Sequence, residues 1–309
     1  MENLQIVAGG SGFIGTNLVE FLLDKGLPVL SIDRFATNIS RNSDYFELLC
    51  DLSVEKDMIL KFIKELKIKN DITIWHLAAN SDIARGMENP KIELNDTFMT
   101  TVNLCNIAKS ISCKNFIFAS TSAVYGDHSN NKLIEDKTEL NPISFYGALK
   151  LASESYLKAF SHENNTKVSL YRFPNVIGKN MTHGLLYDLP RKIDLVQQKV
   201  AILGNGNQTK PYLNVEDLIR LIYQINELSN DRVNVFNLGP NDNGIKIKEI
   251  IELYLAINYP RIKPVFGDSQ NGWVGDVPIV NLSIEKMRTL IPNYNLTSLD
   301  AVNKTLSIK

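Results

Sequence analysis

The composition shows no excess of one charge, few cysteines and no long apolar segment. Thirty-three Lys and Arg stand against 34 Asp and Glu, so the formal net charge is −1 and no overall field favours nucleic acid or an anionic membrane. The three cysteines, Cys50, Cys105 and Cys113, lack pair spacing, which argues against a disulfide framework or a zinc site. The opening MENLQIVAGGSGFIG has no basic segment, so it predicts neither a signal peptide nor a membrane span. We expect a cytoplasmic protein that binds no metal.

Short apolar runs alternate with helical patterns through the first half of the 309-residue chain. The apolar runs are LQIVAG, PVLSID, ITIWHLAA and NFIFAS, and the helical patterns between them are TNLVEFLLDKG, VEKDMILKFIKELK and TVNLCNIAKS. Such alternation is typical of βαβ units, and wholly apolar runs indicate strands that are buried on both faces. The sequence therefore predicts an α/β protein with a doubly wound parallel sheet.

The pattern loosens after VSLYRF into a region rich in Pro, Gly and Asn, roughly residues 174–212. A helical run, NVEDLIRLIYQINEL, and a strand-like NVFNLG then return to the sheet before another irregular segment near residues 271–280. We expect one domain from residues 1–173 plus about 213–240. A second, smaller and discontinuous α/β domain would comprise about 174–212 plus 241–309 and bind the substrate.

The stretch GGSGFIG follows the first apolar run directly and leads into a helical pattern. Its glycines Gly9, Gly12 and Gly15 allow a tight turn and close backbone approach. A pyrophosphate can then bind the amides and the positive dipole of the helix N-terminus. A chance turn is the alternative, but the strand before and the helix after are the context that a dinucleotide-binding motif requires.

Two carboxylates are placed to contact the adenosine part of such a cofactor. Asp33 ends the second apolar run about 20 residues beyond the glycines, where a carboxylate accepts hydrogen bonds from the ribose hydroxyls. Its charge would repel a 2′-phosphate, which favours NAD over NADP, although the neighbouring Arg34 weakens that preference. A turn or helix cap is the alternative role for Asp33. Asp51 would meet the adenine amino group or be an ordinary loop aspartate.

Thr121, Tyr146 and Lys150 are the candidate reacting residues. Thr121 stands at the end of NFIFAS, where open α/β sheets bind ligands, and Tyr146 and Lys150 share one helix face because they are four residues apart. A tyrosine hydroxyl titrates near ~10, so it is a base at neutral pH only if its phenolate is stabilised. A lysine one turn away and a nicotinamide cation would both do this. Coincidence on a helix surface is the alternative.

Motifs along almost the whole chain resemble those of one family. These motifs are GGSGFIG, Asp33, HLAA at 76–79, STSAVYG, YGALK, RFPNVIG at 172–178 and YLNVEDL at 212–218. The chain resembles extended short-chain dehydrogenases/reductases of the nucleotide-sugar epimerase/dehydratase family, and its motifs follow the order found there. The resemblance implies a Rossmann-type sheet, bound NAD and a nucleoside-diphosphate sugar substrate. It also implies that Tyr146 is the base and that Thr121 hydrogen-bonds the reacting sugar oxygen. Lys150 would lower the Tyr146 pKa and hold the nicotinamide ribose.

Within the family, THGLLYDLPRKI, GNGNQTKPYLNVEDL and GWVGDVPIVNLSIEKM look most like UDP-glucose 4-epimerase-like members. The implied cofactor contacts are Gly9, Gly12, Phe13, Ile14, Gly15, Asp33, Arg34, Asp51, Leu52, Leu77, Ala78, Ala79, Tyr146, Lys150 and Phe173. The implied substrate contacts are Ser81, Thr121, Ser122, Asn175, Lys210, Tyr212, Trp273 and Asp276. Helices around 95–110 and 145–160 pair between subunits in relatives, so a homodimer is expected.

The chain departs from the family pattern near the substrate diphosphate. Thr209 and Trp273 occupy positions at which members of the family commonly have arginine. The phosphate charge would then be met by Lys210, Arg191 or Lys179, or by helix amides.

Two further departures bear on the reaction. Dehydratases carry an Asp-Glu pair after the threonine, whereas Ser122 and Ala123 stand here, so water elimination lacks its acid and base. Thr97 replaces a common asparagine. We expect a nucleotide-sugar 4-epimerase that works through a 4-keto intermediate. A 4-dehydrogenase that releases the keto sugar and NADH, or a 4-ketoreductase running the reverse step, would use the same residues. A non-catalytic protein that binds NAD or a sugar nucleotide is a third alternative.

Overall fold

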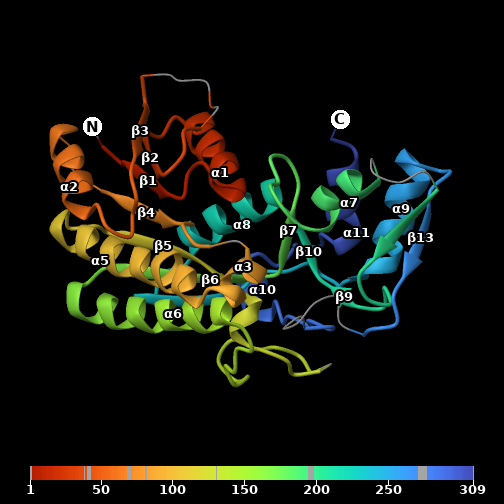
Figure 1. Cartoon of the computed structure of the whole chain (residues 1–309). Helices are drawn as coiled ribbons and strands as arrows, with labels where there is room; N and C mark the ends of the chain where they lie inside the picture. Colours follow the sequence, from red (N-terminus) through yellow and green to blue (C-terminus); the bar gives the residue numbers. More distant parts are fainter. Residues whose placement is uncertain are drawn as a thin grey trace.

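The computed structural model has a seven-stranded sheet at its centre (Figure 1). It describes residues 2–37, 39, 43–67, 71–80, 82–129, 131–193, 198–270 and 277–308. The predicted substrate contacts Ser81, Trp273 and Asp276 lie outside the described residues.

The strand order of this sheet is β11-β6-β5-β4-β1-β2-β3, and each neighbouring pair is parallel. The strands are β1 (Gln5–Ala8), β2 (Val29–Asp33), β3 (Tyr45–Leu49), β4 (Thr73–His76), β5 (Asn115–Thr121), β6 (Lys167–Phe173) and β11 (Val233–Asn237). The chain moves outward from β1 to β3 and then crosses back to β4 on the other side of β1. The predicted Rossmann-type sheet is confirmed, and ligands of such sheets bind at the carboxyl edge beside this reversal.

Helices cover both faces of the sheet (Figure 1). On one face α1 (Phe13–Asp24) packs against α8 (Val215–Leu228). The layer on the other face consists of α2 (Lys56–Glu65), α5 (Thr100–Ser110) and α6 (Phe145–Asn164). Successive strand residues point to opposite faces, so Ile6 joins the core beneath α2 and α5, and Val7 joins the core beneath α1 and α8. Burial on both faces explains why the strands read as continuous apolar runs.

The connection from β4 to α5 contains an unusual helix. After α3 (Ile83–Glu88) and α4 (Pro90–Ile92) comes a π-helix, η1 (Glu93–Met99), which runs directly into α5 and packs against α6. The helical pattern predicted only the α5 part, because a π-helix changes the side-chain periodicity. Such helices are rare and are frequent at functional sites.

Smaller elements lie beyond the carboxyl edge of the sheet (Figure 1). Two-stranded sheets join β7 (Asn175–Ile177) to β10 (Tyr212–Asn214), β9 (Thr209–Lys210) to β12 (Ile245–Lys246) and β8 (Lys199–Ile202) to β13 (Lys263–Phe266). The helices among them are α7 (Leu185–Ile193), α9 (Ile247–Asn258) and α11 (Ser298–Leu306). A further helix, α10 (Glu285–Leu290), packs against β11 and α8 instead. The two-domain division stays a prediction. Ile284 and Met287, which fall in the expected second domain, pack in the core beneath α8.

Cys50, Cys105 and Cys113 are free and buried. Burial raises the pKa of the Cys50 and Cys113 thiols to about 12, so both stay protonated at neutral pH. No helix in the described ranges combines the length and apolarity needed to cross a bilayer.

Candidate active site

The loop between β1 and α1 and the first turn of α1 are packed so closely that one position in each requires glycine. Gly9 has a φ of +87°, and a Cβ there would lie 2.7 Å from the backbone nitrogen of Ala78. A Cβ on Gly15 would overlap the Gly9 carbonyl oxygen, so α1 begins directly against the loop. Gly12 is the N-cap of α1, whose first-turn amides have no partner within the helix. This cradle fits a pyrophosphate group.

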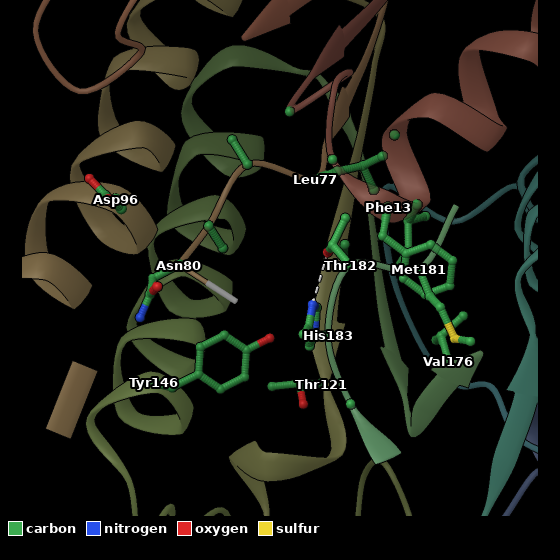
Figure 2. A pocket seen from close by; sticks show the side chains of 18 of the residues that line it. Phe13, Leu77, Asn80, Asp96, Thr121, Tyr146, Val176, Met181, Thr182 and His183 are labelled. Atoms are coloured by element: carbon green, nitrogen blue, oxygen red, sulfur yellow. Dashed lines mark hydrogen bonds between the residues drawn. The ribbon is translucent and has the colours of Figure 1, made fainter. Parts of the chain in front are cut away.

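A cavity of about 720 Å³ runs from this loop past the carboxyl ends of β4 and β5 to the segment before α7 (Figure 2). Its walls include all the predicted cofactor contacts: Gly9, Gly12, Phe13, Ile14, Gly15, Asp33, Arg34, Asp51, Leu52, Leu77, Ala78, Ala79, Tyr146, Lys150 and Phe173. Thr121, Asn175 and Tyr212, from the predicted substrate contacts, line it too. The structure therefore brings these side chains to one space, while their roles stay predictions.

At one end of the cavity Asp33 is held by backbone amides. Its carboxylate accepts hydrogen bonds from the amides of Ser11 at 3.0 Å, Arg34 at 2.7 Å and Phe35 at 3.3 Å. Asp51 lies nearby and accepts from Ser53. Burial acts to raise the pKa of Asp51, but the Ser53 hydrogen bonds and the Arg34 charge outweigh it and lower that pKa. Both carboxylates are thus fixed next to the glycine loop.

At the other end, α6 places Tyr146 and Lys150 beside the end of β5. Ser144 caps α6 by accepting the Gly147 amide at 3.1 Å, so the helix begins immediately before Tyr146. The Lys150 Nζ donates to the Ala119 carbonyl oxygen at 2.8 Å and lies 5.9 Å from the centre of the Tyr146 ring. Figure 2 shows the Tyr146 hydroxyl directed toward Thr121 and His183. Tyr146 and Lys150 therefore lie on one face of α6, as predicted, and both line the cavity.

Burial dominates the titration of this pair. It raises the pKa of Tyr146, and the charge of Glu93 raises it further, whereas the hydrogen bond with Thr121 acts in the opposite direction. Burial also lowers the pKa of Lys150 to about 7, against the charges of Glu93 and Glu154. A strongly perturbed, buried acid–base pair in a cavity is the arrangement expected of a catalytic centre.

Sequence patterns missed the buried acid behind this pair. Glu93, the first residue of η1, is fully buried and accepts hydrogen bonds from Asn80 and Thr97. Asn80 itself lines the cavity and follows β4 closely, so its place at the carboxyl edge of the sheet was a usable signal. Glu93 carries no such signal, because its burial results from the packing of η1 on α6.

The segment before α7 was also missed as a part of the site. Met181, Thr182 and His183 line the cavity, and Figure 2 shows them across from Asn80 and Tyr146. The Thr182 Oγ1 lies 3.1 Å from Nδ1 of His183. Sequence reasoning placed this segment in the second domain and found THGLLYDLPRKI similar to epimerase-like members, but it assigned no contact to these three residues, because the irregular segment gives no periodic pattern.

Two predicted substrate contacts lie outside the cavity wall that the described residues form. Ser122 begins a short 3-10 helix, η2 (Ser122–Val124), directly after Thr121. Lys210 lies in β9, is largely buried and donates a hydrogen bond to the carbonyl oxygen of Val277. Neither is among the described side chains that line the cavity.

The other cations expected near a diphosphate have partners elsewhere. Lys179 pairs with Glu20 at 2.7 Å, and Arg191 stacks 3.5 Å from the ring centre of Tyr187. Arg85 of α3, which the motifs did not single out, does line the cavity. No group of three His, Cys, Asp or Glu residues in the described ranges lies close enough to hold a metal ion.

Residues 5–239, which are most of the chain, match the NAD dependent epimerase/dehydratase family. The chain belongs to this family. UDP-glucuronate 4-epimerase of Thermodesulfobacterium geofontis is 27% identical over 298 residues, covering 93% of this chain and 89% of that protein.

Two solved structures show the same fold. UDP-glucose 4-epimerase of Thermotoga maritima, with UDP-glucose, has a TM-score of 0.85 and 23% identity over 98% of this chain and 97% of that one. UDP-glucuronic acid 4-epimerase of Bacillus cereus, in complex with UDP-glucuronic acid and NAD, has a TM-score of 0.82 and 22% identity over 98% of both chains. The predicted resemblance to UDP-glucose 4-epimerase-like members is confirmed.

Proposed function

We propose that the protein is a nucleotide-sugar 4-epimerase, which oxidises C4 of a nucleoside-diphosphate sugar with NAD and then reduces the 4-keto sugar again. One observation carries the proposal: Thr121, Tyr146 and Lys150 meet in a cavity that begins at a glycine cradle for a pyrophosphate. A cavity of about 720 Å³ is within the range of small-molecule and cofactor sites.

Tyr146 is the proposed base, and it takes the proton of the sugar C4 hydroxyl beside Thr121. Because burial raises the Tyr146 pKa, its phenolate needs nearby positive charge. The Lys150 ammonium, fixed by the Ala119 carbonyl oxygen, supplies part of that charge. NAD, when bound, supplies the hydride acceptor and a further positive charge. The same phenol returns its proton to the C4 oxygen when the sugar is reduced.

The residues after Thr121 favour redox chemistry at C4 alone. Ser122 and Ala123 offer no carboxyl pair for the elimination of water, so a dehydratase reaction lacks its acid and base. A 4-dehydrogenase or a 4-ketoreductase would use the same three residues. The similarity to proteins named 4-epimerases supports the return of the hydride, and the bound sugars named for the two solved structures support UDP as the nucleotide.

The test is an incubation of the purified protein, with NAD, against UDP-glucose, UDP-galactose, UDP-glucuronate and a panel of GDP-, CDP- and dTDP-sugars. Product NMR and the absorbance of reduced nicotinamide are followed together. A C4 epimer without net NADH is expected. Stoichiometric NADH with a keto sugar would assign the 4-dehydrogenase instead. Tyr146→Phe should lower either rate by a factor of about 10³ or more, and full turnover in that variant would overturn the assignment of the base.

We also infer a cytoplasmic homodimer that pairs through α5 and α6. Leu94, Phe145 and Tyr156 are large apolar or aromatic side chains that stay exposed on this layer, at 45%, 49% and 37%. Phe98 and Tyr156 stack edge to face at 5.9 Å and join η1 to α6 on the same surface. Light scattering after size exclusion should give twice the 34.8 kDa mass of the chain.

A further inference from the structure

The guanidinium of Arg34 lies among three carboxylates at the Asp33 end of the cavity. It pairs with Asp96 of η1 at 2.9 Å, and the charges of Asp51 and Asp33 act on it as well. Arg34 and Asp96 both line the cavity. Arg34 directly follows Asp33 and donates its backbone amide to that carboxylate, so the pair belongs to the Asp33 end of the cavity.

An arginine directly after the β2 carboxylate is ambiguous for cofactor choice. A carboxylate at this position binds the free ribose hydroxyls of NAD, whereas a nearby guanidinium can bind the 2′-phosphate of NADP. The hydrogen-bond donors to the Asp33 carboxylate are uncharged backbone amides. The choice therefore depends on whether the guanidinium of Arg34 is available.

The Arg34 guanidinium is not free to bind a phosphate, because it is paired with the carboxylate of Asp96. Burial acts to lower the pKa of Arg34, but the hydrogen bond and charge of Asp96, together with the charges of Asp51 and Asp33, outweigh it and raise that pKa. The backbone of Asp96 lies within η1, where its carbonyl oxygen accepts the Thr100 hydroxyl at 3.0 Å. The side chains of Arg34 and Asp96 remain 46% and 23% exposed, so a change at either position can be accommodated without opening the core.

We propose that Asp96 is a cofactor-selectivity residue, which pairs with Arg34 and so withholds this guanidinium from the 2′-phosphate of NADP. The proposal rests on the proposed function, since it assumes that the cavity binds a nicotinamide dinucleotide. A 2′-phosphate would bring nearly two further negative charges to a place that already faces Asp33, Asp51 and Asp96. Arg34 would have to leave Asp96 to neutralise them.

The experiment compares the binding of NADH and NADPH to the purified chain by nucleotide fluorescence. Mass spectrometry of the denatured protein first identifies any dinucleotide that co-purifies. Asp96→Asn keeps the shape of the side chain and removes its charge, and Asp96→Ser is the second variant. Asp268→Asn removes one exposed negative charge away from the cavity and serves as the matched control. Asp96→Asn/Arg34→Ala tests whether any gain depends on the released guanidinium.

Wild-type protein and Asp268→Asn should prefer NADH. Asp96→Asn and Asp96→Ser should shift the affinity ratio toward NADPH by about tenfold, and Arg34→Ala should cancel that shift. An unchanged ratio in both Asp96 variants, or a shift that persists without Arg34, overturns the role of Asp96. If wild-type protein binds neither nucleotide and carries none, the proposed function itself is overturned, and this inference with it.

Discussion

The side-chain amide of Asn80 donates a hydrogen bond of 2.8 Å to the buried carboxylate of Glu93 and so joins the cavity wall to the π-helix. The other carboxylate oxygen accepts the Thr97 hydroxyl at 2.7 Å, and the same hydroxyl accepts the Asn80 backbone amide at 3.2 Å. Thr97 therefore closes a ring of hydrogen bonds behind the cavity. Glu93 is packed so closely that a Cβ on Gly86 would overlap its carboxylate.

Glu93→Gln should move the whole pH–rate profile to lower pH by about 1 unit. The charge of Glu93 raises the pKa of Tyr146 and also that of Lys150, so its removal lowers both. The charged groups that act on Glu93 are Lys150 of α6 and Asp96 of η1. In the proposed mechanism the two limbs report the successive proton losses of the coupled Tyr146–Lys150 pair, so a lower pKa for both groups moves both limbs to lower pH.

The measurement is kcat against pH with the UDP-sugar that turns over best. Glutamine can accept from the Asn80 amide through Oε1 and donate to the Thr97 hydroxyl through Nε2, so a purely structural role would leave the profile in place. Glu88→Gln, an exposed change on α3, is the control and should reproduce the wild-type profile. A lower kcat with unmoved limbs would contradict an electrostatic role for Glu93.

Lys150→Met should stabilise the cofactor-free protein below neutral pH while it abolishes turnover. Burial lowers the Lys150 pKa from 10.5 to about 7, so the unfolded chain binds one more proton than the folded chain between these values. Wild-type stability therefore rises with pH across that window, and the penalty of burying the ammonium is fully present below it. The variant should be more stable by about 2 kcal/mol near pH ~6.

Urea denaturation at a series of pH values checks this prediction. The advantage of Lys150→Met should shrink as pH rises from about 7 toward about 10. An advantage that stays constant over this range would mean that the methionine acts through packing and not through the lost charge.

Much of the fold could be predicted because the strands are buried on both faces. Apolar runs such as NFIFAS leave few alternatives to a central parallel strand, and the glycine loop then fixes which strand is β1. The places of Asp33, Ala78 and Thr121 in the cavity wall could be predicted for the same reason, since each follows or ends a predicted strand. Parallel strands bring their carboxyl ends to one edge of the sheet, so residues that follow different strands in the sequence lie close together in the structure.

The parts that sequence did not predict depend on partners far along the chain. Arg34 pairs with Asp96 across the sheet edge, and Lys179 pairs with Glu20 on α1. The residues around Lys179 in the sequence do not indicate that its ammonium forms an ion pair with Glu20. Glu93 is likewise buried because it lies in a π-helix, and the periodicity of apolar residues in the sequence does not predict such a helix.

Gly12→Ala and Gly15→Ala should separate cofactor binding from stability. A Cβ on Gly12 would lie 3.3 Å from the Gly9 carbonyl oxygen and would project at the cavity wall, so it should weaken NAD binding by about tenfold or more with little loss of stability. A Cβ on Gly15 would overlap the Gly9 carbonyl oxygen and lie 2.8 Å from the Gly10 Cα. The backbone must move, at a cost of about 1–3 kcal/mol.

NADH titration and urea denaturation of the same preparations provide the two readouts. Gly26→Ala is the control, because Gly26 lies outside the cavity wall. Its φ is +73°, and an added Cβ would have no atom of a non-neighbouring residue within 4 Å. It should lose some stability through backbone strain and keep its NADH affinity. Equal losses of affinity in Gly12→Ala and Gly26→Ala would contradict a phosphate-binding loop.

Arg172→Met should destabilise the fold by about 3–5 kcal/mol, because it leaves the Glu154 carboxylate buried without its guanidinium partner. Both side chains are at most 1% exposed, and two hydrogen bonds of 2.8 and 2.6 Å join them. The Ser120 hydroxyl also donates to Glu154 at 2.5 Å, and Ser120 lines the cavity next to Thr121. The pair thus ties β5, β6 and α6 together beneath the reacting residues.

Arg172→Met/Glu154→Leu should recover part of that loss, since the double change removes both charges and fills the space with apolar atoms. Urea denaturation of the two single variants and the double variant gives the coupling energy directly. A double variant whose loss equals the sum of the single losses would show that the two side chains stabilise the fold independently. Recovered stability without recovered turnover would show, in addition, that the pair holds Ser120 and Thr121 in their working positions.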